Sequence, residues 1–158
     1  MKTTLVAGIG SPFGADQLGW QVIDSLTEHQ EFERHNCELI KLDRPGASLV
    51  EKLQGYDRVI LIDAVQAGKP RGTVIRLDAG QISEQAAGLS SHNFGVAEAV
   101  ALATAMGQLP EGLVLLGLDA GENPDVAFIS GEIDKIIERV VDELSEKEQI
   151  IPSPARGG

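Results

Sequence analysis

The sequence predicts a three-layer αβα sandwich around a twisted, mostly parallel five-stranded sheet with one antiparallel edge strand. Strand-length apolar runs alternate with segments of helical periodicity, which is typical of α/β folds. Two of the runs, 58–65 and 113–118, are almost continuously apolar, as are strands buried on both faces of a parallel sheet. The run 73–77 follows its predecessor too closely for a helical crossover, so we place it antiparallel at an edge.

The first half of the chain supplies three strands and two helices. A strand over Thr3–Ala7 precedes a helix whose apolar residues recur at helical spacing. Those residues are Leu18, Val22, Ile23 and Leu26. The runs Cys37–Leu42 and Arg58–Val65 predict the second and third strands. Between them, a short helix carries Leu49, Val50 and Leu53, and Gly55 closes it.

The rest of the chain supplies two strands and two helices. The edge strand Thr73–Leu77 precedes a polar segment, 78–91, that fits no element. An alanine-rich helix over Phe94–Met106 is narrow enough to lie close against a sheet. After the strand Leu113–Leu118, a final helix carries one buried stripe at the spacing of a single helix face. The stripe consists of Ile133, Ile136, Ile137, Val140, Val141 and Leu144.

The length of the chain predicts one domain. A chain of 158 residues can bury a proper core without metal or disulfide staples, and we assign that core to residues 1–146. The remaining segment, 147–158, carries two prolines and ends in two glycines. We expect this tail to be loosely held.

Charge and cysteine content exclude several classes of function. A formal net charge of −11 disfavours nucleic acid and anionic membranes as partners, because both repel an acidic protein. The single cysteine, Cys37, allows neither an intrachain disulfide nor a thiolate-rich zinc site. The sequence carries no signal-peptide pattern and no apolar run near the roughly 20 residues that span a bilayer. We therefore expect a cytoplasmic protein.

Three polar features converge on one edge of the predicted sheet. The first strand ends in Gly8-Ile9-Gly10, and the loop after it carries Ser11, Asp16 and Gln17 at the start of a helix. Asp63 ends the third strand, whose carboxyl end lies at the same edge as that of the first. His92 precedes the alanine-rich helix. Two carboxylates and an imidazole suit a divalent first-row ion such as nickel, zinc or manganese.

Each of these residues also has a purely structural interpretation. Asp16 is a preferred type of helix cap, since its oxygen accepts hydrogen bonds from free backbone N–H groups. Asp63 is a common type of turn residue at a strand end. His92 stands between Ser91 and Asn93, which are themselves capping residues. No single one of them establishes a site.

Other chemistries are less well supported by the sequence. The Gly8-Ile9-Gly10 loop lacks the third glycine of a dinucleotide-binding motif, because Phe13 occupies that position. No P-loop lysine motif occurs. A hydrolase triad would need Ser90 or Ser91 together with His92 and Asp63, but a serine and a histidine adjacent in sequence seldom face one another, and no nucleophile elbow is present.

The motifs together resemble those of the [NiFe]-hydrogenase maturation endopeptidases, which trim a C-terminal extension from the hydrogenase large subunit after nickel insertion. The stretch from Gly8 to Gln17 is similar to the family's opening G-x-G-N-x-x-x-x-D-[DE] motif. Asp63 corresponds to its strand-end aspartate and His92 to its helix-leading histidine. The segments 70–74 and 115–118 match as well, so the resemblance covers nearly everything before the tail.

The resemblance implies an α/β fold, a hydrogenase large-subunit precursor as partner, and a metal bound by the first-loop acid, Asp63 and His92. It implies that the nickel is carried by the substrate and that the protein holds no metal tightly of its own. We take Asp16, Asp63 and His92 as the candidate catalytic residues, with Gln17 as a further candidate ligand. The peptide bond would be attacked by water polarised by the metal or deprotonated by a carboxylate.

The first loop departs from the family pattern. The family's metal-binding acid is usually the second residue of the D-[DE] pair, and here that residue is the neutral Gln17, with Ser11 in place of asparagine. An amide oxygen is a weaker donor to a cation than a carboxylate, and Asp16 could take its place. The departure motivates a second hypothesis, a non-proteolytic module that binds a nickel-bearing precursor. An enzyme of small metabolites using the same crevice is a third.

Overall fold

The computed structural model describes residues 4–28, 36–84 and 95–150, with side chains described as far as Ser145. Its five strands form one sheet in the order β2-β1-β3-β5-β4, in which only β4 is antiparallel to its neighbour. The predicted fold class is therefore confirmed. The strands are β1 (Thr4–Gly10), β2 (Cys37–Asp43), β3 (Arg58–Val65), β4 (Val74–Asp78) and β5 (Gly112–Asp119).

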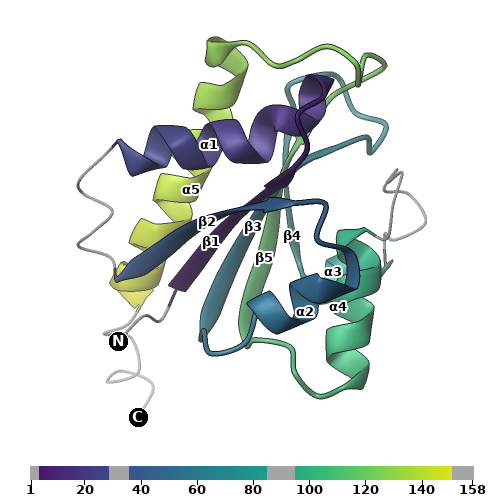
Figure 1. Ribbon diagram of the computed structural model, residues 1–158. Helices are drawn as coiled ribbons and strands as arrows, with labels where there is room; N and C mark the ends of the chain where they lie inside the picture. Colours follow the sequence, from purple (N-terminus) through teal and green to yellow (C-terminus); the bar gives the residue numbers. More distant parts are fainter. Residues whose placement is uncertain (1–3, 29–35, 85–94, 151–158) are drawn as a thin grey trace.

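Helices cover both faces of the sheet (Figure 1). The α-helices are α1 (Leu18–Thr27), α2 (Leu49–Lys52), α3 (Ala79–Glu84), α4 (Val96–Ala105) and α5 (Ser130–Ile150), and the short 3₁₀ helices are η1 (Gly14–Gln17) and η3 (Gly46–Ser48). Along β1, Leu5 packs with α2, α3 and α4, whereas its neighbour Val6 packs with α1 and α5. Because successive side chains of a strand point to opposite faces, both faces of the central strands are buried.

Two glycines bring α1 unusually close to β1. A Cβ atom on Gly8 would lie 2.1 Å from the carbonyl oxygen of Gly19, and a Cβ atom on Gly19 would lie 2.3 Å from the carbonyl oxygen of Ile9. Neither position tolerates a side chain without a backbone shift. The helix that follows the first loop is thereby held directly against the strand that precedes it.

Several element boundaries differ from the predicted ones by one or two residues, and three differences are larger. β1 extends to Gly10, three residues beyond the predicted end, because it pairs with β2 over its whole length. The unassigned segment after β4 contains α3, which begins where Asp78 and Gln81 exchange side-chain and backbone hydrogen bonds. α5 continues to Ile150, past the predicted domain end at Glu146, and residues 151–158 lie outside the described part of the chain.

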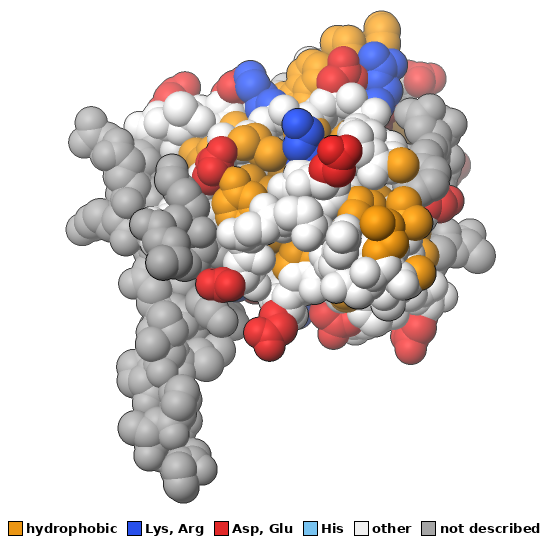
Figure 2. Space-filling view, turned by 60° about the horizontal axis from the view of Figure 1, so that its bottom comes forward, with side chains coloured by type: hydrophobic (Ala, Val, Ile, Leu, Met, Phe, Trp, Pro, Cys, Tyr) orange, Lys and Arg blue, Asp and Glu red, His pale blue; other side chains and the backbone are white. Residues whose placement is uncertain are grey.

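Charge is compensated at the amino end of β3. Arg58, the first residue of that strand, is buried and donates to a side-chain oxygen of Glu143 on α5 at 2.8 Å. Arg76 on β4 contacts the same carboxylate. Elsewhere, Figure 2 shows acidic side chains outnumbering basic ones on the visible face. Among the described residues, none of the helices is both long and apolar enough to span a membrane.

Candidate active site

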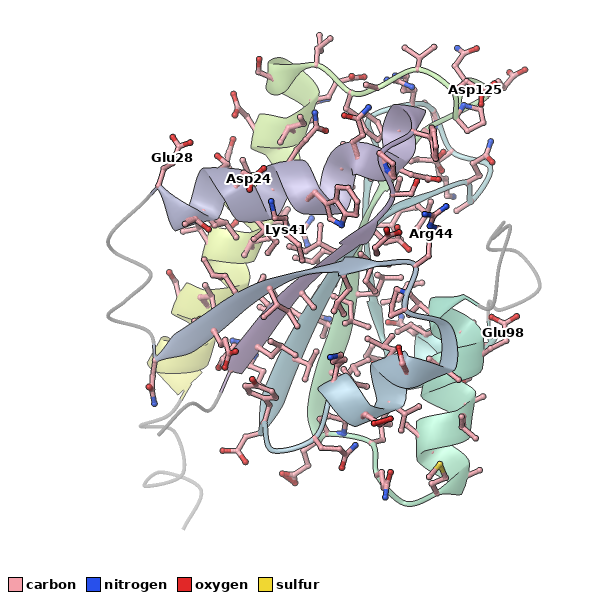
Figure 3. The ribbon with its side chains drawn as sticks, in the orientation of Figure 1. Asp24, Glu28, Lys41, Arg44, Glu98 and Asp125 are labelled. Atoms are coloured by element: carbon pink, nitrogen blue, oxygen red, sulfur yellow. The ribbon has the colours of Figure 1, made fainter. Side chains whose placement is uncertain are left out.

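A pocket of about 310 Å³ opens at the carboxyl edge of the sheet. Its walls come from the ends of β1 and β3, the first loop, the segment after β2, the loop after β5 and the start of α4. Its charged lining residues, among those described, are Asp16, Asp63, Asp125 and Arg44. Figure 3 shows Arg44 just beyond the end of β2 and Asp125 in the loop after β5, at the same end of the sheet.

The first loop folds back on itself and presents Asp16 to this pocket. The backbone N–H of Ser11 donates to the Asp16 carbonyl oxygen at 3.1 Å, and the Asp16 N–H donates to Phe13 at 3.0 Å. A Cβ atom on Gly10 would lie 2.2 Å from that Asp16 carbonyl oxygen, so the tight closure requires glycine there. The buried Ser11 hydroxyl lies 3.5 Å from the Asp16 carboxylate.

The loop after β5 holds the first loop from the other side. The Ala15 N–H donates to the Pro124 carbonyl oxygen at 3.0 Å, and Gly14, with a φ of +53°, leaves no room for a side chain against Asp125. Arg71 in turn secures this second loop. Its guanidinium donates to four backbone carbonyl groups of the loop and to Glu132, and it lies 4.5 Å from the centre of the Phe128 ring.

The negative charge of the Asp63 carboxylate is poorly compensated by the described residues around it. Its enclosure in the protein raises its pKa well above the usual value, and the nearby charge of Asp16 raises the pKa further, while a hydrogen bond from the Ala64 backbone opposes both effects. Among the described residues, no cationic side chain forms an ion pair with it. The site therefore favours either a bound proton or an incoming cation.

The structure brings together part of the predicted constellation. Asp16 and Asp63 line the same pocket, as their shared sheet edge predicts, whereas Gln17, the last residue of η1, is not among the lining residues. His92 lies outside the described residues, although Gly95 and Val96, which follow shortly after it, line the pocket. Within the described ranges, no three histidine, cysteine or acidic side chains are grouped to hold a metal ion.

Two charged lining residues were absent from the predicted site. Arg44 directly follows β2, so the rule that placed Asp63 at the carboxyl edge also places Arg44 there. Asp125 lies in the long loop before α5, and its approach to the pocket depends on the contact between Pro124 and the first loop. The sequence carries a signal for the first of these residues and none for the second.

The sequence matches the family model of hydrogenase maturation proteases over residues 20–147. It is 32% identical over 124 residues to the hydrogenase expression/formation protein HupD of Thiocapsa roseopersicina, covering 77% of this chain and 56% of the relative. This chain thus spans little more than half of that protein. HoxM of Cupriavidus necator, also named a hydrogenase expression/formation protein, is 28% identical over 143 residues, which are 89% of this chain and 69% of the relative.

The fold also matches a solved structure. The hydrogenase maturating endopeptidase HybD from Escherichia coli superposes with a TM-score of 0.72 at 21% sequence identity. The superposition covers 92% of this chain and 93% of the other. The two proteins share their fold.

Proposed function

Because the chain belongs to the hydrogenase maturation protease family, we propose that it is an endopeptidase that removes the C-terminal extension of a [NiFe]-hydrogenase large-subunit precursor after nickel insertion, in the cytoplasm. One observation carries the proposal beyond family membership. Asp16 and Asp63, which come from separate segments, line one pocket at the sheet edge where α/β proteins bind their ligands.

The nickel in this proposal belongs to the substrate. Two carboxylates in one pocket, neither of them in an ion pair with a described cationic side chain, favour a cation that arrives with the precursor. His92, carried by the segment before α4, would supply a nitrogen donor beside them. Cation binding would offset the same unfavourable burial of negative charge that raises the pKa of Asp63. Insertion of nickel would thus be the signal that admits the precursor to cleavage.

The reaction is a hydrolysis. The oxygen of a water molecule bonds to the carbonyl carbon of the scissile peptide, and a carboxylate of the Asp16 and Asp63 pair accepts the proton that this water releases. The bond between carbon and nitrogen then breaks, and the nitrogen takes up that proton. The products are a new carboxyl end on the large subunit and a free amine on the released extension.

The geometry favours the peptidase over a non-proteolytic binding module. The binding-module hypothesis is motivated by the neutral Gln17 at a position where the family usually has an acid. Since Asp16 lines the pocket and Gln17 does not, a first-loop carboxylate is available despite the substitution. Stable association with the precursor, without shortening of its C-terminus, would instead support the binding module.

Cleavage of nickel-loaded and nickel-free precursor tests the proposal directly. We expect the wild-type protein to shorten only the nickel-loaded precursor, as measured by the intact mass of the product. Asp63→Asn and His92→Ala should lower the rate by about 10²–10⁴-fold, the range typical of a lost acid or base. The matched control is Asp24→Asn, an exposed acid on α1 that pairs with Lys41, which should cleave within about twofold of wild type.

Two results would contradict the proposal. Equal cleavage of both precursors would remove the requirement for nickel while leaving the peptidase in place. A wild-type protein that shortens neither precursor, although it is folded and binds them, would replace the peptidase with the binding module.

A further inference from the structure

Arg44 occupies an unusual position at the rim of the pocket. Its φ of +41° lies in the left-handed region, which an arginine rarely adopts, and its backbone N–H donates to the Gly10 carbonyl oxygen at 3.1 Å. That hydrogen bond joins the end of β2 to the start of the first loop. Strained backbone of this kind is concentrated at functional sites, so its side chain merits a functional explanation.

The Arg44 guanidinium is only partly engaged by the protein. Its Nε donates to the Asp43 carboxylate at 2.7 Å, and its side chain is half exposed. That hydrogen bond and the charge of Asp43 raise the pKa of Arg44, and the charge of Asp16 raises it further. Among the described residues, none accepts a hydrogen bond from its two terminal amino groups. A planar pair of donors is therefore available to a ligand.

The charge balance of the pocket indicates which ligand group these donors meet. Three of its described lining residues are acids, and Arg44 is the one cation among them. Peptide hydrolysis develops negative charge on the carbonyl oxygen, which carboxylates alone would repel. Among the described lining residues, Arg44 is the group whose positive charge can offset that repulsion.

We infer that Arg44 is a catalytic residue that donates hydrogen bonds to the carbonyl oxygen of the scissile peptide and stabilises the oxyanion formed there. The inference rests on the proposed peptidase function. As the water oxygen bonds to the carbonyl carbon, the π electron pair moves onto the carbonyl oxygen, where Arg44 holds it. When the bond to nitrogen breaks, that pair restores the carbonyl group, and Arg44 keeps all its protons throughout.

The Arg44→Gly variant separates the side chain from the backbone. Glycine adopts a φ of +41° without strain, so the variant should melt at or above the wild-type temperature, as followed by circular dichroism. We expect kcat on nickel-loaded precursor to fall about 100-fold with KM changed less than about threefold, because oxyanion donors act mainly in the transition state. Millimolar guanidinium should restore part of that loss.

Two further variants complete the test. Arg44→Lys retains the charge but loses the paired donors, so we expect a kcat between those of wild type and Arg44→Gly. Lys41→Gln removes a cation from β2 that pairs with Asp24 and is not among the pocket-lining residues, and it should cleave within about twofold of wild type.

The outcomes distinguish this inference from the function on which it rests. If the wild-type protein cleaves and folded Arg44→Gly cleaves within twofold of it, the inference is overturned and the peptidase stands. A rise in KM alone, without guanidinium rescue, would make Arg44 a substrate-binding residue and would also overturn the oxyanion role. A wild-type protein that cleaves no precursor overturns both.

Discussion

Two aspartates close neighbouring strands at the same edge of the sheet and have opposite surroundings. Asp63 lies near the end of β3, and Asp119 ends β5, with Asp63 paired in register to Gly117. Asp119 is fully buried and accepts hydrogen bonds from the backbone N–H groups of Ala67, Lys69 and Gly121 at 2.8–3.1 Å. Within the described ranges, Asp63 has one backbone donor, at Ala64, and a second acid, Asp16, nearby.

The difference separates a structural acid from a reactive one. Three backbone donors satisfy most of the hydrogen-bonding capacity of the buried Asp119 carboxylate, which ties the loop after β3 to the end of β5. Asp63 is left short of donors and close to Asp16, so its charge is costly until a proton or a cation arrives. Both residues are aspartates near strand ends, so the sequence alone does not distinguish them, but their hydrogen bonds do.

The largest effect that would test this comparison is on stability. Asp119→Asn replaces one of the two acceptor oxygens, both of which face backbone N–H groups, with a donating NH2 group, so we expect the free energy of unfolding to fall by about 2–3 kcal/mol in urea titrations. Asp63→Asn should leave it unchanged or higher near neutral pH. Asp24→Asn, on the exposed face of α1, is the control and should change stability by less than about 0.5 kcal/mol. Equal losses at Asp63 and Asp119 would break the comparison.

A smaller effect lies in the pH dependence of unfolding. Because the pKa of Asp63 is raised in the folded state, its contribution to stability is present below the unfolded pKa and is lost as the pH rises through the folded pKa. Asp63→Asn removes that loss. The stability of this variant relative to wild type should therefore increase as the pH rises from about 4 through the folded pKa of Asp63, as measured by urea titrations at each pH.

Glu143 provides an internal control of opposite sign. Burial opposes its ionisation, but the hydrogen bond and charge of Arg76, together with the charge of Arg58, outweigh burial and lower the pKa of Glu143. Its contribution is therefore present above the unfolded pKa and is lost as the pH falls through the folded pKa. The loss of stability of Glu143→Gln relative to wild type should therefore become smaller as the pH falls. A parallel trend in the two variants would contradict the assigned environments.

The smallest effect concerns the residue next to Asp16. Since Gln17 does not line the pocket, Gln17→Ala should cleave nickel-loaded precursor within about threefold of wild type, whereas Asp16→Asn should lose activity on the scale of Asp63→Asn. Initial rates at saturating precursor measure both variants. If Gln17→Ala were the more damaging substitution, the second acid of the site would have to be reassigned.

The sequence predicted most of the fold because the decisive signals are local. Apolar runs and helical stripes predicted all five strands, the antiparallel edge strand and four of the five α-helices. The short helix α3 was missed because Ile82 is its one buried residue, too little to produce a periodic pattern. Its start was nevertheless visible in principle, as Asp78 and Gln81 cap one another at the spacing of a capping box.

The sequence by itself determined which chemistry is possible at this edge of the sheet, because strand ends and the residues that follow them can be read from the pattern. Asp16 and Asp63 were identified in this way and share the pocket. Tertiary structure alone decided which acid is left uncompensated and which first-loop residue faces inward. Those choices depend on the tight closure of the first loop at Gly10 and on the hydrogen bond from the Ala15 N–H to the Pro124 carbonyl oxygen. The second of these is a contact between distant segments, which no local pattern encodes.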